Sequence, residues 1–377
     1  MGNKFNKKKK DNKNQNEKET KKNDNNEKTG NSKENEKEKN TKEIIVFDEN
    51  ENNNIFLTLL NKQVHSNDKD PIEQVITFPN LKDTIIIASR NGYIKEINDI
   101  TSEHSNNSNI KELYSCNQKI FSLILLKNSS NRICVGLENN IIILKLKLDG
   151  EHTLEKILDL NYPDEGPIYS LLELNNGDII SAGKNITLWK KQSSDSYIKM
   201  NNISIGFYKI INLVEIPFFN TILATQENTH IIYLIREEEK SISLVKSVED
   251  IPSIWYKGSA QNFSKNSMLL VGKFELNVID GENGEKASKY PGIDRGTLLN
   301  LTQKNDESDF WIVSDFNGRY FEFYNQEGSD LIFYEKYVLD DPIKWANILV
   351  RINDECFAAV NHYGEIFVFK INYKDKK

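Results

Sequence analysis

Cysteine is scarce in this sequence, with only three in 377 residues. Cys116, Cys134 and Cys356 form no CxxC pair, and their spacing fits no zinc site. An odd number of cysteines without a secretory pattern is typical of buried thiols in a reducing compartment. The sequence therefore predicts neither a disulfide framework nor a structural metal.

Long hydrophobic runs are absent as well. The longest, such as Ile141–Leu144, are far shorter than the roughly 20 residues that span a bilayer. The first residues, Met1–Lys4, lack the apolar segment of a signal peptide. We therefore expect a soluble, cytoplasmic protein.

The motifs of common enzyme chemistry are missing. The sequence contains no HExxH, GxSxG, GxGxxG or P-loop pattern, and no two histidines at ligand spacing. Acidic runs such as Asp340–Asp341 and Glu237–Glu239 indicate charged turns rather than an acid–base pair. The sequence predicts no enzyme, no cofactor and no small-molecule substrate. Most of the histidines are expected in solvated loops. The five histidines are His65, His104, His152, His230 and His362.

Charge is distributed unevenly along the chain. The first 42 residues carry 14 lysines and 8 acidic residues, a charge of about +6. Because the whole chain has a formal net charge of −7, the remainder carries about −13. Phosphate affinity needs clustered basic residues, so the acidic body is not expected to bind nucleic acid specifically.

The 42-residue tail is almost entirely polar and has one aromatic residue, Phe5. Such a segment is expected to be disordered, because it buries too little apolar surface to offset its ordering entropy. Gly2 followed by Lys7–Lys10 suits N-myristoylation beside a polybasic patch, although Asn6 stands where Ser or Thr is usual. Weak membrane association, a nuclear-import signal and a tail without a role are the open alternatives.

After the tail, short apolar strand segments recur at a spacing of 44 to 47 residues. No long stretch has the period of a helix, and each unit has an earlier strand that usually ends on small residues. A repeat of about 40–45 residues with four strands is what a propeller blade requires. We predict an all-β fold, a seven-bladed β-propeller with four-stranded antiparallel blades over residues 43–377. The repeated segments are Ile94–Ile97, Ile141–Leu144, Ile186–Trp189, Ile231–Leu234, Glu275–Val278, Tyr320–Phe323 and Ile366–Phe369.

The remaining strands follow from the same repeat. Prolines are expected at the start of four innermost strands, where the missing N–H does no harm. They are Pro71, Pro167, Pro252 and Pro342. Six outer strands are expected near Leu113, Leu154, Tyr197, Ile242, Ala287 and Leu331. The seventh outer strand is missing after Phe369, so Ile44–Phe47 or Ile55–Leu60 is expected to complete the last blade and close the ring.

The third unit, Gly166–Trp189, resembles the WD40-repeat family. It has a Pro-Ile start, an Asn-Gly turn at 176–177, a Ser-Ala-Gly strand end and a final Leu-Trp. The resemblance in period and strand order covers roughly Ile55 to Tyr373. No unit has the family's Gly-His pair, and Lys190 follows Trp189, so the family's buried His–Asp–Ser–Trp network is not expected to form.

A binding surface is expected on the top face of the propeller, where inner strands begin and the turns after the second strands lie. Aromatic and arginine residues there suit an acidic or phosphorylated peptide. Packing of the tryptophans between blades is the alternative. The candidates are Trp255, Trp345, Tyr169, Phe121, Arg90, Tyr93, Phe316, Arg319, His362 and Tyr363.

The sequence thus predicts a monomeric, non-catalytic scaffold that binds a protein or peptide of unknown identity. Two other function classes stay open. One is a membrane-tethered adaptor that works through its tail. The other is a propeller enzyme, which a carboxylate or metal cluster converging on the central channel would support.

Overall fold

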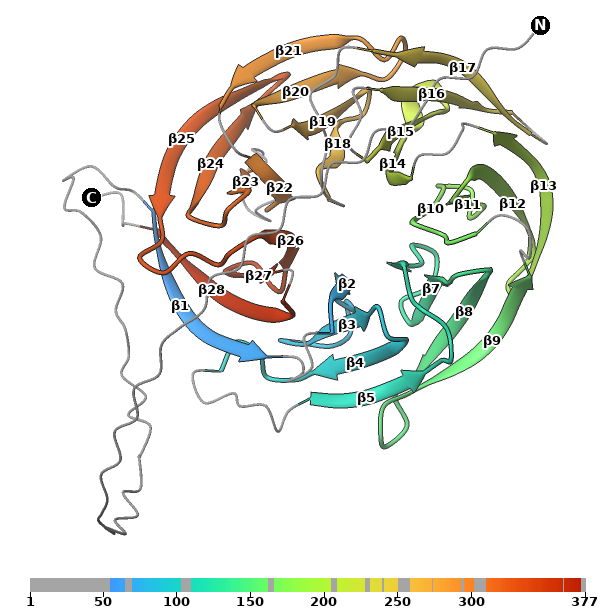
Figure 1. Cartoon of the computed structure of the whole chain (residues 1–377), viewed down its shortest axis with the longest axis horizontal. Helices are drawn as coiled ribbons and strands as arrows, with labels where there is room; N and C mark the ends of the chain where they lie inside the picture. The colour runs from blue at the N-terminus through green and yellow to red at the C-terminus, as the bar shows by residue number, and fades with distance from the viewer. Residues whose placement is uncertain are drawn as a thin grey trace, which may run out of the picture. The chain divides into compact units, whose positions relative to one another are not determined.

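The computed structural model is a ring of seven four-stranded sheets around a common axis, a seven-bladed β-propeller (Figure 1). The predicted fold class is confirmed. The tail with Gly2, and the segment Ile44–Phe47, lie outside the residues that the structure describes. Those residues are 55–64, 70–102, 110–161, 166–204, 209–227, 231–238, 241–249, 258–272, 274–292, 295–301, 310–361 and 363–373.

The first four blades follow one another along the chain, each built from its innermost to its outermost strand. Blade 1 contains β2 (Ile72–Ile76), β3 (Ile85–Ser89), β4 (Tyr93–Ile97) and β5 (Ile110–Ser115). Blade 2 contains β6 (Ser122–Leu125), β7 (Arg132–Gly136), β8 (Asn140–Lys147) and β9 (Thr153–Asn161). Blade 3 contains β10 (Ser170–Glu173), β11 (Ile179–Ala182), β12 (Asn185–Ser193) and β13 (Ser196–Ser204). Blade 4 contains β14 (Ile210–Ile216), β15 (Thr221–Gln226), β16 (Ile232–Glu237) and β17 (Ile242–Val248).

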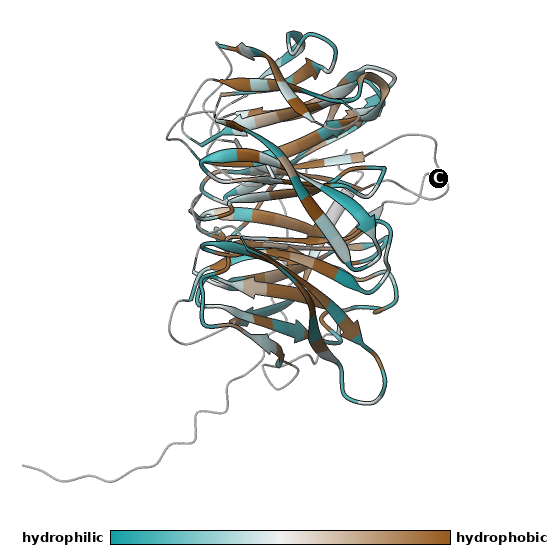
Figure 2. Ribbon diagram, turned by 90° about the vertical axis from the view of Figure 1, so that its right-hand side faces the viewer, coloured by the Kyte–Doolittle hydropathy of each residue, from teal (hydrophilic) through white to brown (hydrophobic). Residues whose placement is uncertain are grey.

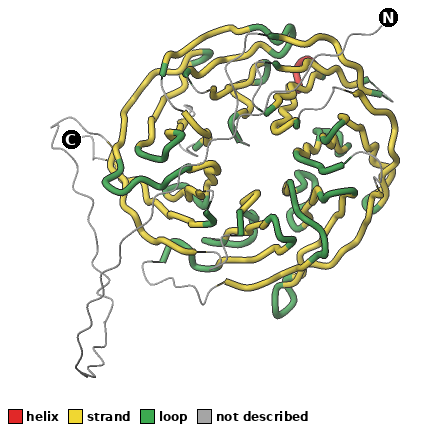
Figure 3. Tube along the Cα trace, in the orientation of Figure 1, coloured by secondary structure: helices red, strands yellow, loops and turns green. Residues whose placement is uncertain are grey.

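The last three blades continue the ring. Blade 5 contains β18 (Ala260–Ser264), β19 (Ser267–Gly272), β20 (Glu275–Asp280) and β21 (Lys286–Pro291). Blade 6 contains β22 (Arg295–Asn300), β23 (Phe310–Asp315), β24 (Tyr320–Glu327) and β25 (Asp330–Val338). Blade 7 contains β26 (Ala346–Arg351), β27 (Cys356–Asn361), β28 (Glu365–Tyr373) and β1 (Ile55–Val64). Within the described residues, the only helix is a 3-10 turn, Pro217–Phe219, and none is long and apolar enough to cross a membrane (Figure 3).

As the 44-to-47-residue spacing requires, each predicted repeat segment lies on the third strand of a blade, except that Ile231 immediately precedes β16. Two of the prolines differ from expectation. Pro71 directly precedes β2, whereas Pro167 and Pro342 lie three and four residues before β10 and β26, in the connections between blades. Proline lacks the N–H that a ladder needs, so it is accommodated before the first paired residue. Pro252 lies outside the described residues.

The hydrophobic core lies between the blades. Among the described residues, seven apolar clusters form, and each joins one pair of neighbouring blades. Aromatic rings fill the interface of blades 6 and 7, where Phe321 and Phe369 each contact Phe357 with ring centroids 5.4 and 5.3 Å apart. Figure 2 shows the apolar colour inside the strands and the polar colour at many turns. Because side chains alternate between the two faces of each strand, the blades pack face to face through their apolar side chains.

The strand β1 closes the ring. It pairs antiparallel with β28 from Ile55 opposite Tyr373 to Val64 opposite Glu365. In blade 6, Tyr337 donates its hydroxyl to the Leu57 carbonyl oxygen at 2.8 Å. Of the two candidate segments, Ile55–Leu60 is thus the one that supplies the outer strand, and the prediction of N-terminal closure is confirmed.

The two faces of the ring carry different connections. We call the face with the turns between second and third strands the top face. The connections between blades lie on it too, because Cys116 N donates to Gly92 O at 3.0 Å and Ile120 N donates to Arg90 O at 3.3 Å. The bottom face carries the turns between first and second strands and between third and fourth strands. At Gly92, with φ of +95°, a Cβ atom would collide with the Cys116 carbonyl oxygen, so glycine is required.

Candidate interaction surface on the top face

The structure separates the predicted site residues into groups. Phe121, Tyr169 and Arg90 lie at the start of neighbouring inner strands and turns, in what we call the inner-rim cluster. Trp345 and Tyr363 form a second group on blade 7, which we call the aromatic pair. Trp255 and His362 lie outside the described residues.

The rings of the inner-rim cluster come together because they occupy the same position before the innermost strands of two neighbouring blades. Phe121 and Tyr169 each immediately precede the first residue of an innermost strand, β6 and β10. Their backbone N–H groups donate to Gly136 O and Ala182 O, both at 2.9 Å. This places the two rings edge to face, with centroids 5.4 Å apart and planes at 78°.

Two ion pairs border these rings. Lys209 Nζ lies 5.1 Å from the Tyr169 ring centroid and 3.1 Å from Glu227 Oε2. Arg90 Nε donates to Glu73 Oε1 at 2.6 Å. Burial raises the pKa of the Tyr169 phenol, and the nearby Lys209 opposes this only in part. The phenol therefore stays neutral at physiological pH.

The aromatic pair is an exposed stack. The side chains of Trp345 and Tyr363 are 42% and 38% exposed. Their ring centroids are 5.9 Å apart and their planes differ by 15°. Trp345 thus keeps a large exposed surface, unlike a residue packed between blades.

The backbone under the aromatic pair is strained. Lys344 and Trp345 have φ values of +50° and +64°, a region that side-chain-bearing residues rarely adopt. Such a conformation costs on the order of 1–3 kcal/mol per residue and persists only when its surroundings hold it.

Buried contacts on both sides hold this loop. The Ile343 N–H donates to Gly318 O at 2.9 Å, and the Asn361 side-chain amide donates to Ile343 O at 2.9 Å. Asn361 Oδ1 also accepts from the Tyr363 N–H at 3.0 Å. Asn361 is fully buried, so one side chain positions both members of the aromatic pair.

Of the other predicted residues, Tyr93 lies on blade 1, whereas Phe316 and Arg319 share the turn between β23 and β24 of blade 6. Tyr93 is 38% exposed and has Lys95 Nζ 5.5 Å from its ring centroid. Phe316 is half-buried. Arg319 is exposed, and Asp315 holds its guanidinium through two hydrogen bonds of 2.8 and 3.2 Å. The carboxylate partners of Arg90, Lys209 and Arg319 were not predicted, because acidic residues in turns carry no distinctive sequence signal.

No protein-family model matches this chain, and no curated protein matches it at a significant level. The structure establishes the fold class alone. The chain is a seven-bladed β-propeller.

The other reactive side chains are those of the cysteines and His152. Burial raises the pKa of Cys134 well above its usual range and that of Cys356 to about 11, so both remain thiols. Cys116 is only half-buried, in contrast to the prediction of three buried cysteines. His152 lies in the turn before β9 as expected, but it is partly buried, and its Nδ1 lies 2.6 Å from Oε1 of the buried Glu96. Among the described residues, no three His, Cys, Asp or Glu side chains gather as a metal site.

Proposed function

We propose that the protein is a non-catalytic interaction platform that binds a segment of a partner protein on its top face. The observation that carries the proposal is the aromatic pair. Two exposed, stacked rings are held by the fully buried Asn361 on a backbone that is costly to form. Large rigid aromatic side chains dominate binding energy at protein interfaces, so Trp345 is the expected anchor.

The partner segment is expected to be acidic or phosphorylated. Arg90 and Lys209 are exposed on the same face, each paired with one glutamate. Arginine and lysine each have more N–H donors than one glutamate uses, so a partner carboxylate or phosphate can bind Arg90 and Lys209 while Glu73 and Glu227 stay paired. We place the protein in the cytoplasm as a monomer on the sequence expectations given above.

We further propose that the propeller is WD40-like. Supporting this, the Trp189 indole N–H donates to Ser181 Oγ at 2.9 Å in the unit that resembles the family. This is the Ser–Trp part of the family's buried network. Ser181 is buried, and Trp189 is 3% exposed.

The first prediction tests the aromatic pair. Full-length protein and its Trp345→Ala and Tyr363→Ala variants are used as baits in affinity purification from the native cell. Loss of a hot-spot ring costs about 2 kcal/mol or more, so the specific partner should fall below detection at matched bait concentration.

The matched control is Phe218→Ala, which removes an aromatic side chain that is 71% exposed on the bottom face. This variant should retain the partner, and all three should melt like the wild type. Equal partner recovery with Trp345→Ala and Phe218→Ala would refute a role for the aromatic pair.

A further inference from the structure

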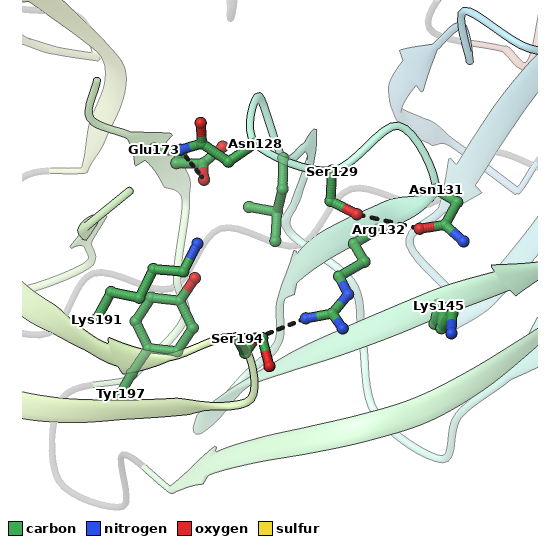
Figure 4. A pocket seen from close by; sticks show the side chains of 10 residues that line it. Asn128, Ser129, Asn131, Arg132, Lys145, Glu173, Lys191, Ser194 and Tyr197 are labelled. Atoms are coloured by element: carbon green, nitrogen blue, oxygen red, sulfur yellow. Dashed lines mark hydrogen bonds between the residues drawn. The ribbon is translucent and has the colours of Figure 1, made fainter. Parts of the chain in front are cut away.

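A polar cavity of about 290 Å³ lies on the bottom face between blades 2 and 3 (Figure 4). Two cross-strand pairs form its walls. Arg132 on β7 is directly opposite Lys145 on β8, and Lys191 on β12 is directly opposite Tyr197 on β13. Neighbouring blades therefore present three cationic side chains and a phenol to one space.

The pairing of Arg132 with Lys145 is unfavourable by itself. Like charges directly opposite each other on an antiparallel sheet repel. Asp195 offsets one of them, because its Oδ1 lies 2.7 Å from Arg132 Nη1. Glu155, opposite Lys145 on β9, pairs instead with Lys147 at 2.9 Å. Lys145 is left beside a second cation.

The acceptors around the cavity are engaged within the protein. The Glu173 carboxylate accepts from the Lys127 backbone N–H and, at 3.2 Å, from the Asn128 amide. Asp178 accepts from the Lys191 backbone N–H at 2.7 Å. The carboxylates at this site therefore bind backbone and amide donors rather than the lysine ammonium groups.

Three hydrogen-bond donors at the cavity have no partner among the described residues. Within the described part of the chain, Lys145 Nζ, Lys191 Nζ and Tyr197 Oη make no hydrogen bond or ion pair. Figure 4 shows Lys191 and Tyr197 extending toward the cavity from the side opposite Arg132 and Lys145. Tyr197 is only 9% exposed, and its hydroxyl lies at the wall of the cavity. Burial raises its pKa, so it remains a donor.

We propose that this cavity binds the phosphate group of a small phosphate monoester. A phosphate accepts several charge-assisted hydrogen bonds, so it uses the two ammonium groups and the phenol while relieving the repulsion between Arg132 and Lys145. The volume is at the lower end for ligand pockets, which favours a small molecule. No sequence motif marks this site, because its four side chains belong to different strands of two blades.

The test is calorimetric titration of the full chain with glycerol 2-phosphate at constant ionic strength, with glycerol as the neutral counterpart. Saturable binding of the phosphate alone is expected. Lys145→Gln, Lys191→Gln and Tyr197→Phe should each weaken it about tenfold, which corresponds to roughly 1.4 kcal/mol. The control, Lys184→Gln, removes an exposed lysine from a top-face turn and should leave binding unchanged.

Absence of saturable binding overturns the proposal, and so does an equal effect of Lys184→Gln and Lys191→Gln. A phosphoserine tripeptide separates a protein source of the phosphate from a small molecule, and binding of the tripeptide alone also contradicts the proposal. Because the cavity and the aromatic pair lie on opposite faces, Trp345→Ala should bind glycerol 2-phosphate normally. Failure of one site is thus distinguishable from failure of the other.

Discussion

At the scale of single residues, Asn361 and Glu365 connect ring closure to the proposed binding surface. Asn361 donates to Ile343 O and to Glu365 Oε2, while Lys62 Nζ of the closing strand lies 3.0 Å from Glu365 Oε1. Burial alone raises the pKa of Glu365, but the hydrogen bonds from Lys62 and Asn361 outweigh it and lower the pKa below its usual value. The ionised carboxylate is therefore the form that the fold stabilises.

The second prediction follows from the sign of this shift. A carboxylate with a lowered folded-state pKa contributes stability above its unfolded-state pKa, roughly 4.3, and loses it as the pH falls through the folded-state value. Glu365→Gln should therefore be less stable than wild type at pH 7, and the difference should shrink as the pH falls below about 4. Urea unfolding at pH 7 and at pH 3 measures this.

The control for this prediction is Glu112→Gln, because Glu112 is an exposed carboxylate on the outer strand β5. Its stability should follow wild type at both pH values. A Glu365→Gln deficit that is the same at pH 7 and pH 3 would assign the effect to packing rather than to ionisation.

At the scale of elements, β1 is the outer strand that the last blade takes from the other end of the sequence. Without it, β28 would be an exposed sheet edge, with unpaired N–H and C=O groups that invite aggregation. Leu57 would also be lost from the aromatic-rich core between blades 6 and 7. Ring closure by β1 therefore stabilises the last blade through both hydrogen bonds and apolar packing.

The third prediction compares two truncations. Deletion of residues 1–60 removes most of β1 and should lower the melting temperature markedly and promote aggregation. Deletion of residues 1–42 leaves β1 complete and should melt like the full chain. Differential scanning calorimetry with light scattering measures both effects, and equal melting of the two truncations would contradict closure by β1.

At the scale of the whole molecule, the ring depends on contacts between blades. Glu215 at the end of β14 accepts from the Asn175 N–H of blade 3 and from Lys127 Nζ of blade 2, both at 2.9 Å. Glu173 makes the equivalent contact one blade earlier, with the Lys127 N–H. Buried carboxylates thus connect blades 2, 3 and 4 along the bottom face.

The fourth prediction compares carboxylates on the two faces. Glu215→Ala removes a buried carboxylate together with its hydrogen bonds from the Asn175 N–H and Lys127 Nζ, and should lower the unfolding free energy by about 1–3 kcal/mol. Glu227→Ala breaks the more exposed pair with Lys209 and should cost about 0–1 kcal/mol. Urea unfolding of both variants checks this, and equal losses would count against the proposed connection between blades.

The sequence by itself determined the blades. Strand positions, the seven-fold repeat and the need for an N-terminal closing strand all follow from local apolar patterns and their spacing, and the structure confirms them. A strand pattern is local because alternation along a few residues decides which side chains are buried. Phe121, Tyr169 and Trp345 each immediately precede an innermost strand, so their positions on the top face follow from the same repeat.

Only the tertiary structure decided what meets across the blades. The choice of Ile55–Leu60 for closure, the pairing of His152 with Glu96, and the cavity shared by Lys145 and Lys191 all join residues far apart in sequence. The loop that carries Trp345 is held by contacts of Ile343 with Asn361 and Gly318, and no local pattern encodes these contacts. The physical reason is that such contacts form only when the ring fixes the distance between neighbouring blades.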